Sequence, residues 1–182
     1  MNHIKLPRVA LSVRQPSAWA IIHCGKDIEN RSIGSVRAGR MVPGRICIHA
    51  AVGMTQDEYR YITMRMSEIG CVAPPPGDLV RRAIIGTVDV VGIVKPGDTD
   101  SPWMARASAT PESRGLVLEN PLPIEPIPAA GALGYFEWEE SGDVAPQQNW
   151  MRKWSEVNGD ADTGDLFDDL EPSFGTPPKR PW

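Results

Sequence analysis

The chain has no uninterrupted hydrophobic run of the roughly 18 residues that a membrane-spanning helix needs. Its first residues, Met1–Lys5, also lack the apolar segment that is typical of a signal peptide. From these two absences we expect no membrane partner and a cytoplasmic location.

Cysteine is scarce as well, with three in 182 residues, and no Cys-x-x-Cys pair occurs. This odd and widely spaced set predicts no disulfide framework. Cys24 and Cys47 lie in apolar runs and are expected to act as small buried side chains. The histidines are scattered at His3, His23 and His49, so we expect neither a bound metal nor another cofactor.

What the chain does contain is the composition of a globular domain, 41% hydrophobic and 23% charged. Apolar alternation predicts extended segments at residues 8–13, 27–31, 45–50, 82–94, 115–119 and 135–138. Helical periodicity predicts helices at 16–24 and 55–69, whereas residues 33–43 are expected to form a loop. This order, without βαβ repetition, indicates an α+β fold around a small curved sheet.

Both predicted helices carry signals at their ends. Pro16 suits a first helical turn, and Gly25 suits the residue after a last turn. The second helix opens with Thr-Gln-Asp-Glu, in which Thr55 and Glu58 have the spacing of a capping box, and it ends before Gly70.

Charge is distributed unevenly along the chain. Residues 1–50 carry eight basic and two acidic side chains, whereas residues 139–182 carry four basic and ten acidic ones. If the basic side chains lined one groove, they would attract phosphate; otherwise they form an ordinary solvated surface. The sequence pI of about 5.4 argues against strong nonspecific binding to nucleic acid. Seven of the eight basic residues in the first part are Arg8, Arg14, Lys26, Arg31, Arg37, Arg40 and Arg45.

Three ionisable side chains follow the first helix within six residues, at Lys26, Glu29 and Arg31. In an extended segment Glu29 and Arg31 lie on the same face, where the guanidinium can orient the carboxylate. Such a group is suited to the floor of a polar cleft. The alternative is a surface ion pair worth ~0–1 kcal/mol.

The segment Gly25–Arg31 resembles the Gly-x-Lys-x-x-Glu-x-Arg signature of ASCH domains, with Gly25 and Lys26 adjacent where the family has one residue between them. Further blocks resemble core strands of the same domain, in the same order, over about residues 8–138: Leu11–Pro16, Gly44–Ala51, Ile85–Val91 and Leu116–Pro121. The resemblance implies a PUA-like pseudo-β-barrel of five to six strands, flanked by two or three helices. It also implies a cavity between helix and barrel that takes nucleic acid or nucleosides.

Some ASCH proteins hydrolyse the amide of N(4)-acetylcytidine, and their loop lysine matches Lys26. Glu29 stands where those enzymes have a threonine, and their separate catalytic glutamate has no match here. If this chain is an enzyme, Lys26 and Glu29 are its catalytic candidates. A neighbouring carboxylate stabilises the ammonium of Lys26, which weakens a nucleophilic lysine, while Glu29 remains a possible general base.

If the chain only binds its ligand, Lys26 and Arg31 would bind a phosphate, and Glu29 or Asn120 would form hydrogen bonds with the edge of a base. Trp103 follows Asp-Ser-Pro in a predicted loop, where an exposed ring could stack on a base, whereas Trp19 lies among apolar residues of the first helix. The expected ligand-binding set is Arg14, Gln15, Lys26, Glu29, Arg31, His49, Trp103 and Asn120, although a core role for His49 is the simpler reading.

Beyond the domain predicted at residues 1–138, residues 139–159 are expected to form an extension with a helix at 147–156. Residues 160–182 are acidic and are predicted to be disordered. Their segment Leu166–Leu170 could dock on a partner, cover the basic cleft, or only keep the chain in solution.

Three functions follow from these observations. The favoured one is a nucleic-acid-binding module that recognises RNA or a modified or flipped nucleotide. The second is a small hydrolase that acts on a nucleoside amide or on an RNA phosphodiester. The third is a protein-interaction module whose acidic tail and whose predicted helix with Trp150 and Trp154 make the partner contacts. The sequence leaves open whether the ligand is RNA, DNA or a free nucleoside.

Overall fold

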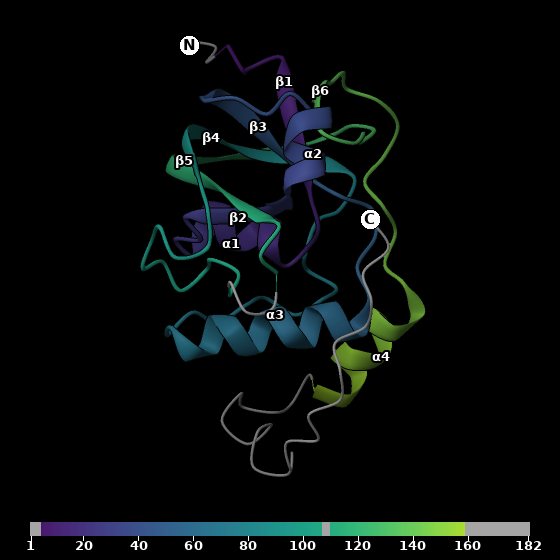
Figure 1. The fold of residues 1–182 in the computed structure, drawn as a ribbon. Coiled ribbons are helices and arrows are strands. Elements are labelled where there is room, and N and C mark those ends of the chain that lie inside the picture. Colours follow the sequence, from purple (N-terminus) through teal and green to yellow (C-terminus); the bar gives the residue numbers. More distant parts are fainter. Residues whose placement is uncertain (1–4, 107–109, 159–182) are drawn as a thin grey trace.

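A computed structural model describes residues 5–106 and 110–158, which form a six-stranded sheet with four helices. The sheet is curled, and its strand order is β2-β5-β4-β3-β1-β6 (Figure 1). The strands are β1 (Val9–Val13), β2 (Ile28–Ser32), β3 (Gly44–Ala50), β4 (Ala83–Val94), β5 (Ser113–Pro128) and β6 (Tyr135–Glu137). The helices are α1 (Ser17–His23), α2 (Ile33–Ala38), α3 (Gln56–Glu68) and α4 (Asn149–Asn158). The predicted α+β fold class is confirmed.

Helix α1 is the centre of the packing. It contacts β3, β4 and β5 on one side, and in Figure 1 it lies between the strands and α3. Ala18, Ile21 and Ile22 are buried, as the apolar stripe of the sequence predicts. Trp19 lies on another side of α1 and packs against the group that contains Tyr59 of α3. This helix therefore has side chains in more than one layer of the molecule.

The capping box of α3 is confirmed. The Glu58 backbone N–H donates to the Thr55 hydroxyl, and the Thr55 N–H donates to the Glu58 carboxylate at 3.0 Å. The expected loop at 33–43 instead begins with the short helix α2, because the hydroxyl of Ser32 accepts from the N–H of Ser35 and caps it.

Strand β5 is much longer than the predicted segment 115–119. Its first part pairs with β2, and its whole length is antiparallel to β4. The prolines of its second half, at 121, 123, 126 and 128, conceal this strand in the sequence because proline cannot donate to a sheet ladder. Proline also protects a strand edge from further pairing.

The expectation of no disulfide is wrong for one pair. Cys24, at the end of α1, is bonded to Cys71, which follows α3. The two Cα atoms are 6.1 Å apart, within the range that a disulfide spans, although 47 residues separate them in sequence. Cys47 is free and buried, as predicted.

The C-terminal extension returns to the domain. The guanidinium of Arg82 donates to the Ser141 carbonyl, and the N–H of Ala145 donates to the Arg81 carbonyl at 2.9 Å. Helix α4 then packs Trp150 and Trp154 against Tyr59 of α3. The predicted acidic tail, 160–182, lies outside the described residues. Among the described helices, none combines the length and the apolar character that crossing a membrane requires.

The packing of α1 on β4 predicts that Gly86→Ala destabilises the protein. A Cβ at this position would lie 2.5 Å from Ile22 Cδ1 and 2.8 Å from the Leu122 carbonyl oxygen, which belongs to the backbone and cannot rotate away. We expect a loss of about 1–3 kcal/mol in the free energy of unfolding, measured with urea. Gly92→Ala on the same strand is the control, because its Cβ would meet only Val117 Cγ2, at 4.0 Å. Equal losses in the two variants would contradict the close packing.

Candidate functional site

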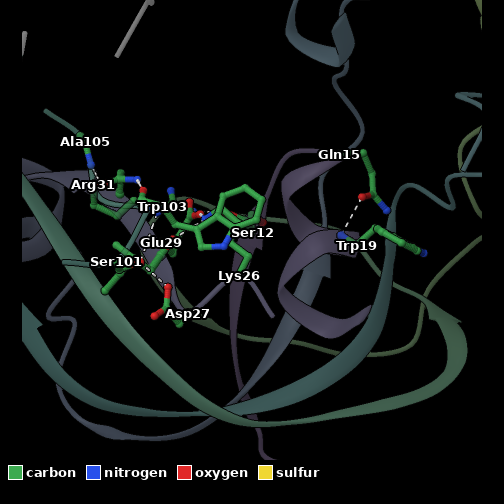
Figure 2. Close-up of polar contacts among 12 residues, drawn as sticks. Ser12, Gln15, Trp19, Lys26, Asp27, Glu29, Arg31, Ser101, Trp103 and Ala105 are labelled. Carbon is green, nitrogen blue, oxygen red and sulfur yellow. Dashed lines mark hydrogen bonds and ion pairs between the residues drawn. The ribbon is translucent and has the colours of Figure 1, made fainter. Parts of the chain in front are cut away.

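The three charged side chains that follow α1 meet in one buried cluster. Lys26 Nζ is 2.7 Å from one carboxylate oxygen of Glu29, and Arg31 Nη2 is 3.2 Å from the other. Their side chains are only 5%, 10% and 22% exposed in the order Lys26, Glu29, Arg31. Figure 2 shows them grouped beside Ser12 and beneath Trp103. The predicted convergence is present, but the cluster is closed to solvent over most of its surface.

The cluster connects three segments of the backbone. Lys26 also donates to the carbonyl of Ile28, and Arg31 donates to the carbonyl of Ser12 in β1. Glu29 and Arg31 share a face of β2, as alternation along a strand requires. Arg31 Nε is buried and has no hydrogen-bond partner among the described residues. The cluster therefore ties the end of α1, β2 and β1 together.

Trp103 covers this cluster and is not an exposed stacking ring, so the sequence-based expectation for it is wrong. It is 8% exposed, and Lys26 Nζ lies 5.9 Å from its ring centroid. Asn30 of β2 holds the covering loop by donating to the Trp103 carbonyl at 2.7 Å and accepting from the Ala105 N–H at 2.9 Å. The loop thus takes the place that a ligand would need above Lys26.

The space that remains beside Lys26 is small. This hollow has a volume of about 60 Å³ and is lined by Ile21, Gly25, Lys26, Asp27, Val88, Leu118 and Pro121. Water molecules fit into such a volume, but a nucleobase does not.

The structure separates the other predicted site residues from this cluster. Arg14 pairs with Glu58 at the start of α3. Asn120 donates to Asp89 at 2.8 Å on the outer side of the sheet, where Asp89 also binds Arg45. Hydrogen bonds from Asn120 and Arg45 lower the pKa of the Asp89 carboxyl. These residues already have protein partners, and nothing brings them to Lys26.

His49 is a core residue. Its Nε2 lies 3.1 Å from the Ala129 carbonyl, which can only accept, so Nε2 carries the proton and Nδ1 accepts from the Ser12 hydroxyl at 2.9 Å. Burial lowers the pKa of the imidazole. A Cβ on Gly131 would lie 2.7 Å from Ser12 Oγ, so the backbone of Gly131 covers this pair. Neither Ser12 nor His49 lines the small hollow beside Lys26 or the larger one beside α1.

A much larger hollow lies beside α1. It has a volume of about 410 Å³ and contains Gln15 of the predicted set. The whole lining is Gln15, Trp19, His23, Asp78, Val80, Ile85, Pro123, Ile124, Glu125 and Pro126. Sequence reasoning gave Trp19 to the core and did not consider Asp78 or Glu125. The sequence did contain one indication of this hollow. Trp19 and His23 are four residues apart, so they lie on the same face of a helix.

Gln15 gives this hollow a rigid wall. Its side-chain amide donates to the Val80 carbonyl at 2.8 Å and accepts from the Trp19 N–H at 2.9 Å, the second of which is drawn in Figure 2. The rings of Trp19 and His23 lie 5.2 Å apart with a 30° angle between their planes. Within the described part of the chain, no three His, Cys, Asp or Glu side chains are grouped to hold a metal ion.

The charge cluster predicts that Glu29→Gln strongly destabilises the protein. The substitution leaves Lys26 and Arg31 charged and largely buried without their shared carboxylate, at a cost of about 3 kcal/mol in the free energy of unfolding. Urea denaturation measures this loss. Glu137→Gln is the control, because its pair with Arg8 is 69–78% exposed and contributes ~0–1 kcal/mol. A loss within that surface range for Glu29→Gln would rule out a structural role for the cluster.

The buried His49 predicts a pH dependence of stability. Because its pKa is lowered in the folded protein, the unfolded chain binds the proton more readily. Stability is therefore complete above the ordinary histidine pKa of about 6.5 and decreases as the pH falls from there toward the folded pKa. Unfolding free energies measured between pH 7.5 and 5 should decrease less steeply in His49→Gln than in the parent chain. An effect of the same size in His23→Gln, a substitution at an exposed position, would contradict this origin.

Comparison with known proteins gives structural similarity alone. No family model matches the chain, and no curated protein matches it. A crystal structure of ASCH from Zymomonas mobilis is similar, with 15% sequence identity and a TM-score of 0.36, covering 82% of this chain and 93% of that one. A mutant of the Zymomonas mobilis protein gives 16% identity and a TM-score of 0.37, covering 82% and 94%. The printed names of both structures carry the name of the ASCH family, which the motif blocks resemble.

Proposed function

We propose that this chain binds a single unstacked nucleobase, from RNA or another nucleic acid or from a free nucleoside, in the hollow beside α1. The observation that supports this most directly is the combination of a hollow of about 410 Å³ with an aromatic side chain in its wall. Hollows of ~300–1,000 Å³ are typical of small-ligand sites. This is the favoured function of the sequence analysis, moved from Lys26 to the other side of α1.

Stacking is the first interaction that the hollow offers. Trp19 provides a flat ring, and His23 extends it along the same face of the helix. Unpaired bases bind proteins in this manner, and one stacked base contributes ~1–3 kcal/mol. An apolar part of the wall, formed by Val80, Ile85 and the prolines of β5, suits the faces of a base.

Hydrogen bonding to the base edge is the second interaction. Asp78 and Glu125 line the hollow, and their carboxylates can only accept when ionised. Acidic side chains recognise the amino groups of bases, such as the exocyclic amine of cytosine. The hollow thus combines a surface for the ring with acceptors for its edge.

Hydrolysis by Lys26 is less well supported than binding. A lysine that acts as nucleophile or base needs its amine free to reach the substrate, whereas Lys26 Nζ is paired with the Glu29 carboxylate at 2.7 Å. Lys26 also donates to the Ile28 carbonyl and lies under Trp103. The nucleoside amidohydrolase and ribonuclease alternatives would therefore need another reactive group.

The protein-interaction alternative loses part of its basis, because α4 uses Trp150 and Trp154 to pack against Tyr59 of its own domain. A partner for the acidic tail stays a prediction, and so does the cytoplasmic location.

Binding can be tested by calorimetric titration of the full chain with nucleosides and short single-stranded oligonucleotides. We expect Trp19→Leu to weaken binding by about tenfold or more, since it removes the stacking surface. Trp154→Leu is the matched control, because Trp154 packs in the same apolar cluster but does not line the hollow. The proposal is wrong if no nucleoside or oligonucleotide binds, or if both variants weaken binding equally.

A further inference from the structure

The hollow beside α1 has two carboxylates in its lining, and His23 is the one basic side chain there. Its lining contains two carboxylates, Asp78 and Glu125, and no lysine or arginine. Neither carboxylate forms an ion pair or a hydrogen bond with a residue that the structure describes. The field of Asp78 reaches the neighbouring Tyr59, whose pKa burial raises to about 12 with a further contribution from Asp78.

The arginines that neighbour the lining residues in sequence have other partners. Arg14, which precedes Gln15, pairs with Glu58. Arg81, which follows Val80, is buried and donates to the carbonyls of Val52 and Pro146. Neither arginine lines the hollow.

The backbone of β5 also makes the hollow unfavourable for an anion. Pro123 and Pro126 line the hollow, and proline has no N–H to offer. An anionic ligand would therefore face two carboxylates and, at Pro123 and Pro126, a backbone without N–H donors. A phosphate in this hollow is disfavoured, whereas a ligand that brings positive charge and donors is favoured.

The ring of Trp19 is a further partner for a positively charged ligand in this hollow. The face of an indole attracts cations, and this attraction increases when the cation is taken out of water. Trp19 forms one wall of the hollow, and the carboxylates of Asp78 and Glu125 also line it. Aromatic and carboxylate groups in one hollow suit a flat ligand that is both cationic and able to donate.

From this arrangement we infer that the hollow selects a base that carries positive charge, as ring-methylated bases do, over a neutral base of the same size. The inference rests on the proposed function, because it specifies the class of base that enters the same hollow. It also assigns recognition of charge to Asp78 and Glu125.

Two isomeric nucleosides test this selectivity. 1-Methyladenosine carries positive charge at neutral pH, whereas N6-methyladenosine has the same atoms and is neutral. In calorimetric titrations of the full chain at pH 7 and moderate salt, we expect the cationic isomer to bind at least about tenfold more tightly. High salt should reduce this ratio, because screening weakens attraction between exposed charges.

The variant Asp78→Asn/Glu125→Gln keeps the shape of the hollow and removes its charge, so the ratio between the isomers should fall to about twofold or less. Glu119→Gln is the matched control, since Glu119 is exposed on the same strand but does not line the hollow. An unchanged ratio in the double variant would remove the assigned role of the two carboxylates.

The outcomes separate this inference from the proposed function. If N6-methyladenosine or an unmodified base binds as tightly as 1-methyladenosine, charge selection is wrong while base binding stands. If neither isomer nor any unmodified base binds, the proposed function fails and takes this inference with it.

Discussion

The carboxylate of Glu29 is the interaction on which the rest of this structure depends. It binds Lys26 and Arg31 at once, and these side chains also hold the carbonyls of Ile28 and Ser12. A buried ion group is stable only if each charge has a partner. The carboxylate therefore fixes how the end of α1, β2 and β1 meet. Trp103 and its loop complete the arrangement by covering Lys26.

Closing this cluster decides where a ligand can enter. With Lys26 covered, the hollow that we propose as the binding site lies elsewhere, bordered by Trp19 and His23 of α1 and by Gln15, which precedes this helix. The same short helix thus takes part in both places. The buried cluster pairs two cations, Lys26 and Arg31, with one carboxylate. The larger hollow has two carboxylates in its lining and no lysine or arginine. The sequence predicted charged side chains and a ligand in one cleft. In the structure the predicted charged side chains form a buried cluster, and the larger hollow is a separate place lined by two carboxylates.

Several features were predictable because they depend on local rules. The capping box of Thr55 and Glu58 needs only the spacing of a helical turn. The shared face of Glu29 and Arg31 needs only the alternation of a strand. The buried stripe of α1 follows from helical periodicity in the same way. Each of these involves residues a few positions apart, whose relative placement is set by the backbone alone.

The sequence by itself determined the α+β class, most element positions and the convergence of Lys26, Glu29 and Arg31. Only the tertiary structure decided that this convergence is buried, since Asn30 and Trp103 that close it are 73 residues apart. It also paired Cys24 with Cys71 and brought Asp78 and Glu125 to the same hollow as Trp19. Exposure and long-range proximity depend on how elements pack against one another, and no local pattern of residue types encodes that packing.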